Sequence, residues 1–228
     1  MAGGVTPAGR GREVEFKFRV DGPAAFEALA RASGARPSPA VTQTNHFFDT
    51  ADRALNRGRH TLRLREENGR FLLTAKGPGE RAGALTSRAE EEVEVPRAEA
   101  EAIIHDTQSP LAALEARAEP RARDLLAAMR GLVGDRPLRH VGVFRNDRAH
   151  LTVTLEVDGR RLPVIFEMDT TTFPAGQVHY EVEVEIAGTE EAAVERALHA
   201  YFKKADVAWR EGPSKAKRFF DAAAGQPI

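Results

Sequence analysis

The sequence contains no cysteine among its 228 residues. This absence excludes disulfide bonds, thiolate metal sites, iron–sulfur clusters and cysteine nucleophiles. The net charge is also close to zero, since 33 lysines and arginines stand against 34 aspartates and glutamates. Such a balance argues against binding to nucleic acid or to an anionic membrane by bulk charge. No apolar run approaches the roughly 18 residues of a transmembrane helix, and the N-terminus lacks the apolar segment of a signal peptide. We therefore expect a cytoplasmic protein with no nucleic-acid partner and no membrane partner.

Several catalytic motifs are missing as well. The sequence has no G-x-x-x-x-G-K-[ST] and no G-x-S-x-G, and its seven histidines do not show the HExxH spacing. These absences argue against a P-loop, a serine hydrolase and a zinc hydrolase. Hydrophobic residues nevertheless make up 42% of the chain, which is enough for a folded core.

Alternation of charged and apolar residues predicts strands along most of the chain. Strands are expected at residues 13–20, 41–50, 59–66, 70–77, 87–95, 138–146, 150–157, 160–169 and 178–186. The dipeptides Asn68-Gly69 and Asp158-Gly159 are typical of hairpin turns. Helical spacing is expected at residues 23–34, between 97 and 134, and from Thr189, followed by a polar tail through Lys215 to Phe220.

The domain organisation follows from these patterns. Residues 1–11 carry four glycines and a proline without apolar periodicity, so we expect a flexible tail. Residues 12–222 are expected to form a single domain with a helical insertion at about 97–134. Because most connections between strands are hairpins, the predicted class is α+β with an antiparallel sheet.

Charged side chains are sorted onto one face of six predicted strands. In residues 13–20, Glu13, Glu15, Lys17 and Arg19 point to one side and the apolar residues to the other. The same sorting recurs in later strands at Arg63, Arg65, Thr74, Lys76, Arg88, Glu90, Glu92, Glu94, Glu167, Asp169, Glu181, Glu183 and Glu185. An ordinary sheet with one solvated face would show the same alternation.

Neighbouring carboxylates on one face repel one another unless a cation neutralises them. The acids stand beside Lys17, Arg63, Arg65 and Lys76, so the face combines an acidic and a basic cluster. This chemistry suits an anion held by the bases and Mg²⁺ or Mn²⁺ held by the acids. If the sheet closes with this face inside, the interior must stay wet or hold a ligand, because unpaired buried charges are costly.

The segment Glu13-Val14-Glu15-Phe16-Lys17 resembles the Glu-x-Glu-x-Lys motif of CYTH domains, the triphosphate tunnel metalloenzymes. The resemblance covers roughly residues 12 to 220, and its motif spelling is most similar to that of stand-alone inorganic triphosphatases. The further motifs that carry it, in the order of the family, are Asn45-His46-Phe47-Phe48-Asp49-Thr50, Leu62-Arg63-Leu64-Arg65, Leu73-Thr74-Ala75-Lys76-Gly77, Ser87-Arg88-Ala89-Glu90-Glu91-Glu92, Phe166-Glu167-Met168-Asp169, Tyr180-Glu181-Val182-Glu183-Val184-Glu185 and Ser214-Lys215.

This resemblance implies an antiparallel eight-stranded β-barrel tunnel with a charged interior and helices packed outside. It also implies that a small-molecule triphosphate binds end-on with Mg²⁺ or Mn²⁺. Separately, we expect the protein to act as a monomer or homodimer. The implied substrate-binding residues are Lys17, Arg63, Arg65, Lys76, Arg148 and Lys215, and we add Arg19 because it shares the charged face with Lys17. The implied metal ligands are Glu13, Glu15, Glu167, Asp169, Glu181, Glu183 and Glu185. The residues assigned to catalysis are Glu13, Glu15, Lys17, Glu90, Glu92 and Asp169.

Two of these assignments have alternatives. Arg145 lies close to Arg148, although Asn146 and Arg148 fit the family spacing better. The three glutamates of residues 178–186 share one parity, so the motif of this strand fits in two registers.

The expected activity is metal-dependent hydrolysis of inorganic triphosphate, a phosphoanhydride, by in-line attack of water. Two other activities use the same tunnel, namely those of class IV adenylyl cyclases and thiamine triphosphatases. An alternative of a different class is a non-catalytic module that binds polyphosphate or nucleotide.

Overall fold

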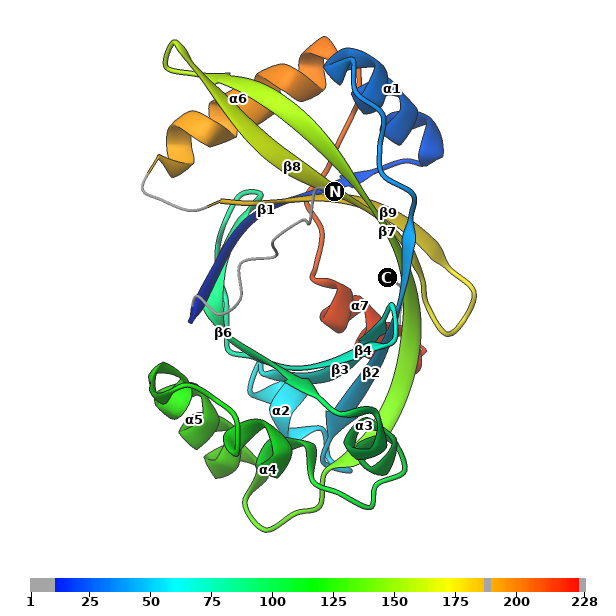
Figure 1. Cartoon of the computed structure of the whole chain (residues 1–228), viewed down its shortest axis with the longest axis vertical. Helices are drawn as coiled ribbons and strands as arrows, with labels where there is room; N and C mark the ends of the chain where they lie inside the picture. Colours follow the sequence, from blue (N-terminus) through cyan, green and yellow to red (C-terminus); the bar gives the residue numbers. More distant parts are fainter. Residues whose placement is uncertain (1–10, 187–189, 226–228) are drawn as a thin grey trace. The chain divides into compact units, whose positions relative to one another are not determined.

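The structure, a computed structural model, describes residues 11–186 and 190–225 (Figure 1). The chain divides into two compact units. Unit 1 contains Gln43–Glu80 and Ser87–Phe144 together with the chain up to Glu13, and unit 2 contains Val14–Thr42, Arg81–Thr86 and the chain from Arg145 onward. The predicted tail lies outside the described residues except for its last residue, and the single-domain organisation stays a prediction.

Nine strands are present in the described residues: β1 (Arg12–Val20), β2 (Val41–Asp49), β3 (Thr61–Glu67), β4 (Arg70–Lys76), β5 (Glu80–Ala82), β6 (Leu85–Val95), β7 (Arg139–Val157), β8 (Arg160–Thr172) and β9 (Val178–Glu185). Hydrogen bonds join them in the order β1-β9-β8-β7-β2-β3-β4-β6-β5, and β1 also pairs with β6. The pairing order therefore closes on itself through eight strands, with β5 as an additional short strand. This topology confirms the predicted α+β class with an eight-stranded antiparallel β-barrel.

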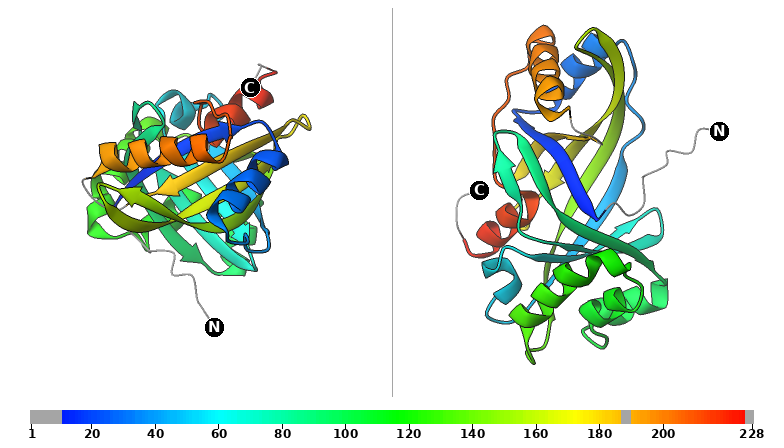
Figure 2. Two further views of the ribbon diagram at one scale, coloured as in Figure 1. Left: turned by 90° about the horizontal axis from the view of Figure 1, so that it is seen from above. Right: turned by 90° about the vertical axis from the view of Figure 1, so that its left-hand side faces the viewer.

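In unit 2, β1, β9, β8 and β7 pair as antiparallel neighbours. One face of these strands is apolar and includes Phe16, Phe166 and Val182, all fully buried. Helices α1 (Pro23–Ser33) and α6 (Glu191–Lys204) cover this face, and their residues Leu29 and Leu198 belong to the same core (Figure 2). The opposite face carries the charged residues of the strands. The last helix, α7 (Lys215–Ala223), also belongs to this unit.

In unit 1, β2, β3, β4 and β6 form the corresponding antiparallel ladder. The predicted helical segment contains α3 (Arg97–Ile104), α4 (Pro110–Glu115), the 3₁₀ helix η1 (Pro120–Ala122) and α5 (Arg123–Val133), and a short α2 (Ala54–Arg57) precedes β3. Leu114 and Met129 from these helices join Leu62, Leu64 and Leu73 in a second core. The helices thus cover the apolar face of the strands and leave the charged face to the other side (Figure 1).

One long strand, β7, replaces the two strands that were predicted at 138–146 and 150–157, so the predicted break is wrong. Asp147, Arg148 and Ala149 pair with β8 without interruption, for example Asp147 with Thr170 and Ala149 with Met168. Neither glycine nor proline occurs at the expected break, so the backbone has no reason to turn there.

The predicted polar tail is wrong as well, because Lys215–Ala223 forms α7. The Ser214 side chain caps this helix by accepting a hydrogen bond from the backbone N–H of Lys217. Phe219 and Phe220 of this helix are buried, and Arg218 joins the helix to Glu181 of β9. The strand β5 and the helix α2 were not predicted. Helix α6 begins at Glu191, and the predicted start at Thr189 lies outside the described residues.

None of the helices in the part of the chain that the structure describes has both the length and the apolar character needed to cross a membrane.

Two histidines of unit 1 contact each other between β2 and β7. His46 Nδ1 lies 3.1 Å from His140 Nε2, so one ring donates a hydrogen bond and the other accepts it. The backbone N–H of His140 also donates to Asp106, and the rings of Phe48 and His140 are in contact. Burial, with a smaller contribution from His140, lowers the pKa of His46 to about 4. Burial also lowers the pKa of His140, against the attraction of Asp106. The folded protein therefore keeps this pair neutral.

We expect the melting temperature to fall as the pH decreases from 6.5 towards 4. In this interval His46 takes up a proton in the unfolded chain but stays neutral in the folded protein, so protonation favours unfolding. The variant His46→Gln should lose less stability over this interval, whereas His105→Gln, at an exposed position after α3, should match the wild type. Thermal melts followed by circular dichroism between pH 7.5 and pH 4.5 measure this. Parallel pH dependences in all three proteins would contradict the assignment.

Candidate functional site

The charged face of unit 2 carries a mostly buried group of side chains, which we call the unit 2 cluster. The strand register places these side chains opposite one another. Arg148 of β7 lies opposite Asp169 of β8, and Asp169 in turn lies opposite Glu181 of β9. Glu167 of β8 lies opposite Glu183 of β9. On β1, Lys17 lies opposite Glu183. The members of the cluster are Glu15, Lys17, Asn146, Arg148, Glu167, Asp169, Thr171, Glu181, Glu183, Lys215 and Arg218.

Arg148 binds several acids of this cluster at once. Its Nε lies 2.7 Å from Asp169 Oδ1, and its Nη2 lies 2.6 Å from Asp169 Oδ2 and 2.7 Å from Glu183 Oε2. Glu167 also pairs with it. Burial acts to lower the pKa of Arg148, but Asp169 and Glu167 outweigh it and raise that pKa. The guanidinium thus bridges β8 and β9 as a permanent positive charge.

Asp169 has a further neutral partner. Its Oδ1 accepts a hydrogen bond of 2.7 Å from Asn146 Nδ2, and Asn146 Oδ1 accepts one of 2.7 Å from Thr171 Oγ1. All three residues are almost completely buried. This relay fixes the orientation of the Asp169 carboxylate, since each polar atom in it has a defined partner.

Lysines provide the remaining neutralisation. Lys215 Nζ, from α7, lies 2.8 Å from Asp169 Oδ2, 2.8 Å from Glu181 Oε2 and 2.6 Å from Glu183 Oε1. Lys17 Nζ lies 2.7 Å from Glu15 and 2.5 Å from Glu183. Glu183 is therefore shared by Lys17 of β1 and Lys215 of α7.

These cations keep the buried acids ionised. Burial alone would raise the pKa values of Asp169, Glu181 and Glu183. Arg148 and Lys215 outweigh burial at Asp169, and Lys215 and Arg218 do so at Glu181, so both pKa values are lowered. Lys17, Lys215 and Arg148 together hold the pKa of Glu183 well below its ordinary value.

The cluster still has unused polar atoms. Arg218 is fully buried and donates from Nη2 to Glu181 Oε2 at 2.8 Å, but its own Nε has no hydrogen-bond partner in the described residues. The other oxygen of Glu181, Oε1, is likewise buried and without a partner there. Arg19 pairs in register with Glu181, yet its buried Nε is also unsatisfied within the described part of the chain.

Unit 1 carries a second group, the unit 1 cluster, on the charged face of β3, β4 and β6. Lys76 Nζ lies 2.8 Å from Glu13 Oε1 and 3.1 Å from Glu90 Oε1, and Arg88 Nε lies 2.6 Å from Glu13 Oε2. The members of this cluster are Glu13, Arg63, Arg65, Thr74, Lys76, Arg88, Glu90 and Glu92.

Arg63 and Arg65 are poorly neutralised. Arg63 lies 3.9 Å from Glu92, Arg65 lies 3.9 Å from Glu67, and both buried Nε groups lack a partner in the residues that the structure describes. Burial, followed by repulsion from Arg65, lowers the pKa of Arg63 to about 10. Two neighbouring, mostly buried guanidinium groups with unused donors form a site that favours an anion.

Most of the predicted site residues lie in these two clusters. The structure places Glu13, Arg63, Arg65, Lys76, Glu90 and Glu92 in the unit 1 cluster, and Glu15, Lys17, Arg148, Glu167, Asp169, Glu181, Glu183 and Lys215 in the unit 2 cluster. Arg19 lies beside the unit 2 cluster on the same face of β1.

The structure distinguishes between the alternatives that the sequence left open. Arg148 is in the unit 2 cluster, whereas Arg145 is exposed and pairs with Asp147. Glu181 and Glu183 are buried, whereas Glu185 is exposed at the end of β9, opposite Glu15.

Five members of the clusters were absent from the predicted site: Thr74, Arg88, Asn146, Thr171 and Arg218. Arg88 was recognised on the charged face but received no role. Asn146 fits the family spacing beside Arg148 and carries no charge that the pattern would detect. Arg218 follows Lys215 by three residues, a spacing that places both on one face of a helix, but the segment was interpreted as a tail.

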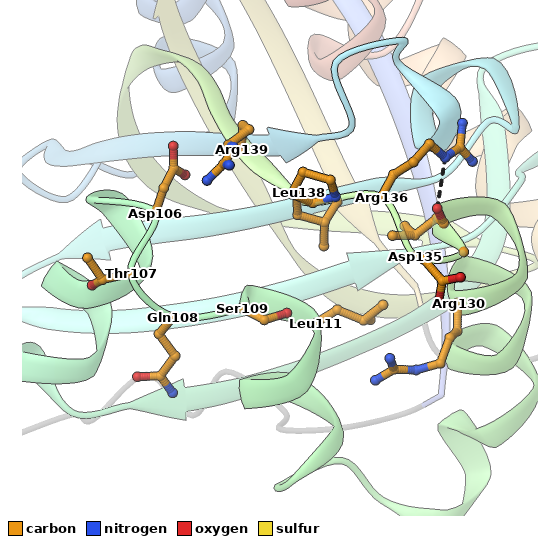
Figure 3. A pocket seen from close by; sticks show the side chains of 13 residues that line it. Asp106, Thr107, Gln108, Ser109, Leu111, Arg130, Asp135, Arg136, Leu138 and Arg139 are labelled. Carbon is orange, nitrogen blue, oxygen red and sulfur yellow. Dashed lines mark hydrogen bonds between the residues drawn. The ribbon is translucent and has the colours of Figure 1, made fainter.

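A separate cavity of about 400 Å³ lies in unit 1, lined by the segment 106–111, residues of α5 and the segment 133–139 (Figure 3). It contains none of the predicted site residues. Two of its arginines are already occupied, since Arg130 pairs with Glu115 and Arg136 with Asp52. Arg136 Nε also donates to the carbonyl of Val133 at 2.9 Å. These contacts make the cavity a weaker anion site than the unit 1 cluster.

The acids of the unit 2 cluster have the chemistry that a hard divalent cation requires. Three carboxylates converge on one point, and the buried Glu181 Oε1 offers a free oxygen. Within the described residues, no group of three or more histidine or acidic side chains is arranged as a ready metal site. The ammonium of Lys215 stands at the point of convergence instead.

Comparison with known proteins gives consistent results. The family model of the CYTH domain matches residues 11–220. A protein of Bacillus subtilis (strain 168), YjbK, which is named as a candidate triphosphatase, is 35% identical over 68 residues. That match covers 30% of this chain and 35% of the relative, so it spans about a third of the curated relative's length.

Two solved structures share the fold. The Hippeastrum protein HpAC1, described as a candidate adenylyl cyclase with a dominant triphosphatase activity, has a TM-score of 0.75 at 24% identity and covers 95% of this chain and 97% of its own. A candidate adenylate cyclase of Bacillus halodurans has a TM-score of 0.63 at 22% identity and covers 92% of this chain and 100% of its own.

Replacement of Arg148 by methionine should destabilise the protein by about 3–5 kcal/mol, because it leaves Glu167, Asp169 and Glu183 without their shared cation. The matched change Arg145→Met, three residues earlier on β7 at an exposed ion pair, should alter stability by at most about 0.5 kcal/mol. Urea denaturation at pH 7 gives both values. Similar losses in the two variants would mean that the unit 2 cluster is not held together as described.

Proposed function

The chain belongs to the CYTH domain family, and from this premise we propose that it hydrolyses inorganic triphosphate with the help of a divalent metal ion. The observation that carries the proposal is the pair Arg63 and Arg65, whose buried guanidinium groups lie near each other with unused donors. A multivalent anion would bind both guanidinium groups directly, whereas the carboxylates near them lie at 3.9 Å.

Basic residues of the charged faces would bind the phosphate oxygens. Arginines grip phosphate bidentately, and lysines add compact positive charge. Charge placed along the triphosphate offsets the charge of its oxygens and favours transfer of the terminal phosphoryl group. The residues proposed for this role are Lys17, Arg19, Arg63, Arg65, Lys76, Arg148 and Lys215.

The acids would hold Mg²⁺ or Mn²⁺, because carboxylate oxygens suit hard cations that also bind phosphate. When bound, such an ion neutralises phosphate charge and lowers the pKa of a bound water. The proposed metal ligands are Glu13, Glu15, Glu167, Asp169, Glu181, Glu183 and Glu185. We assign the positioning of the attacking water and the removal of its proton to the set Glu13, Glu15, Lys17, Glu90, Glu92 and Asp169.

A second candidate is cyclisation of ATP to cyclic AMP, since both solved structures above are described as candidate adenylyl or adenylate cyclases. Thiamine triphosphate is a further substrate that the same chemistry would accept. The identity of the metal, the cytoplasmic location and the choice between monomer and homodimer stay predictions.

Phosphorus NMR separates these functions. The protein is incubated with tripolyphosphate, ATP or thiamine triphosphate in the presence of Mg²⁺ or Mn²⁺. We expect tripolyphosphate to give orthophosphate and pyrophosphate. Cyclic AMP and pyrophosphate from ATP would establish the cyclase instead, and tight binding of all three without turnover would indicate a binding module.

Turnover should need both clusters. The variants Lys76→Ala, in the unit 1 cluster, and Glu15→Gln, in the unit 2 cluster, should each lower kcat for tripolyphosphate by at least about 100-fold. Arg70→Ala is the matched control, because Arg70 lies on the same strand as Lys76 but is exposed and pairs with Glu94. Unchanged kcat in either cluster variant, with a normal melting temperature, would refute the site.

A further inference from the structure

Lys215 occupies an unusual position for a residue expected to bind phosphate. All three donors of an ammonium group are matched by carboxylates, with Nζ 2.6 to 2.8 Å from Asp169, Glu181 and Glu183. Its side chain is only 14% exposed, and the three acids are more deeply buried still. The ammonium therefore has the surroundings of a coordinated cation rather than those of a free phosphate-binding group.

A divalent ion and this ammonium would compete for the same oxygens. The acids converge on Lys215 from β8 and β9, and the free oxygen Oε1 of Glu181 is available as a further ligand. Two cations at one point would repel each other strongly at the low effective dielectric of a buried site. Metal binding to these acids thus requires that the ammonium move away.

The helix itself does not have to move. Arg218, one turn later on α7, donates to Glu181 and contacts His179, and Phe219 and Phe220 are buried. These contacts anchor α7 on unit 2 independently of Lys215. The lysine side chain is flexible, so its end can leave the acids while its backbone stays in place.

We propose that the Lys215 ammonium is a resident cation of the Asp169, Glu181 and Glu183 carboxylates, and that a divalent metal ion exchanges with it and releases it to bind phosphate. This inference rests on the proposed function, because it explains how the metal and the triphosphate are bound in order. Before metal binding, Lys215 neutralises the acids. Afterwards, it is free to neutralise the anion.

Metal binding without phosphate tests the exchange. Isothermal titration with MnCl₂ should show about tenfold or tighter binding to Lys215→Met than to the wild type, since the variant has no ammonium to displace. Lys217→Met is the matched control on the same helix, because Lys217 is exposed and pairs only with Asp221 among the described residues. Its affinity should stay within about twofold of the wild type.

The gain should persist at 0.5 M KCl, because salt screens a general charge effect but screens a buried contact much less. Wild-type or weaker Mn²⁺ affinity in a folded Lys215→Met protein would overturn the exchange. So would a gain that disappears at high salt.

A second measurement uses the wild-type chain and does not depend on the folding of a variant. All three donors of the Lys215 ammonium are engaged by carboxylates and its side chain is only 14% exposed, so the paired amine reacts slowly with acylating reagents. Brief treatment with acetic anhydride, followed by peptide mass spectrometry, should show severalfold more acetylation of Lys215 with Mn²⁺ than without it. Equal or lower acetylation with Mn²⁺ would overturn the proposal.

These results are separable from those of the proposed function. Turnover of tripolyphosphate, with equal Mn²⁺ affinity in Lys215→Met and wild type and equal acetylation with and without Mn²⁺, would refute the exchange at Lys215 and support the proposed hydrolase. Exchange at Lys215 without turnover of tripolyphosphate would refute the proposed hydrolase and support Lys215 as the resident cation.

Discussion

Buried carboxylates on neighbouring strands are tolerated only because cations lie between them, and this pairing is the constraint on which unit 2 depends. The register puts Asp169 beside Glu181 and Glu167 beside Glu183, so repulsion across the strands is built into the backbone pairing. Arg148 and Lys17 neutralise these rows within 2.5 to 2.7 Å. An apolar face with the same packing would fold at least as well. The buried charges are therefore not needed for stability, and their presence indicates a function.

The two units balance their charges differently. In unit 2, Lys17, Arg148, Lys215 and Arg218 each lie within 2.8 Å of a carboxylate. In unit 1, Arg63 and Arg65 have their nearest carboxylates at 3.9 Å and keep unused donors. If the charges served only to neutralise one another within the fold, two neighbouring guanidinium groups would not be left with distant carboxylates and unused donors. The incomplete pairing points to an anionic ligand, and membership of the CYTH family gives that ligand a chemical class.

The sequence predicted the faces of the strands because side chains alternate with a strict period of two. Glu13, Glu15 and Lys17 were placed correctly on one face by this rule alone. The rule failed where charge interrupted a strand without a turn residue, as at Asp147 in β7. It also could not determine partners across strands, since these depend on register. Family spacing favoured Arg148 over Arg145, and the register then placed Arg148 opposite Asp169.

Helix α7 was predicted as a polar tail, and the reason for this error is physical. Its only large apolar residues are two adjacent phenylalanines, Phe219 and Phe220, in a nine-residue helix that also contains lysines and alanines. Tertiary packing and the Ser214 cap, rather than an extended amphipathic stripe, keep it folded. This origin matters for the site, because Lys215 reaches the acids from a helix and not from the sheet. The register sets the positions of the strand bases, whereas Lys215 takes its position from a helix that Arg218 joins to Glu181 and His179.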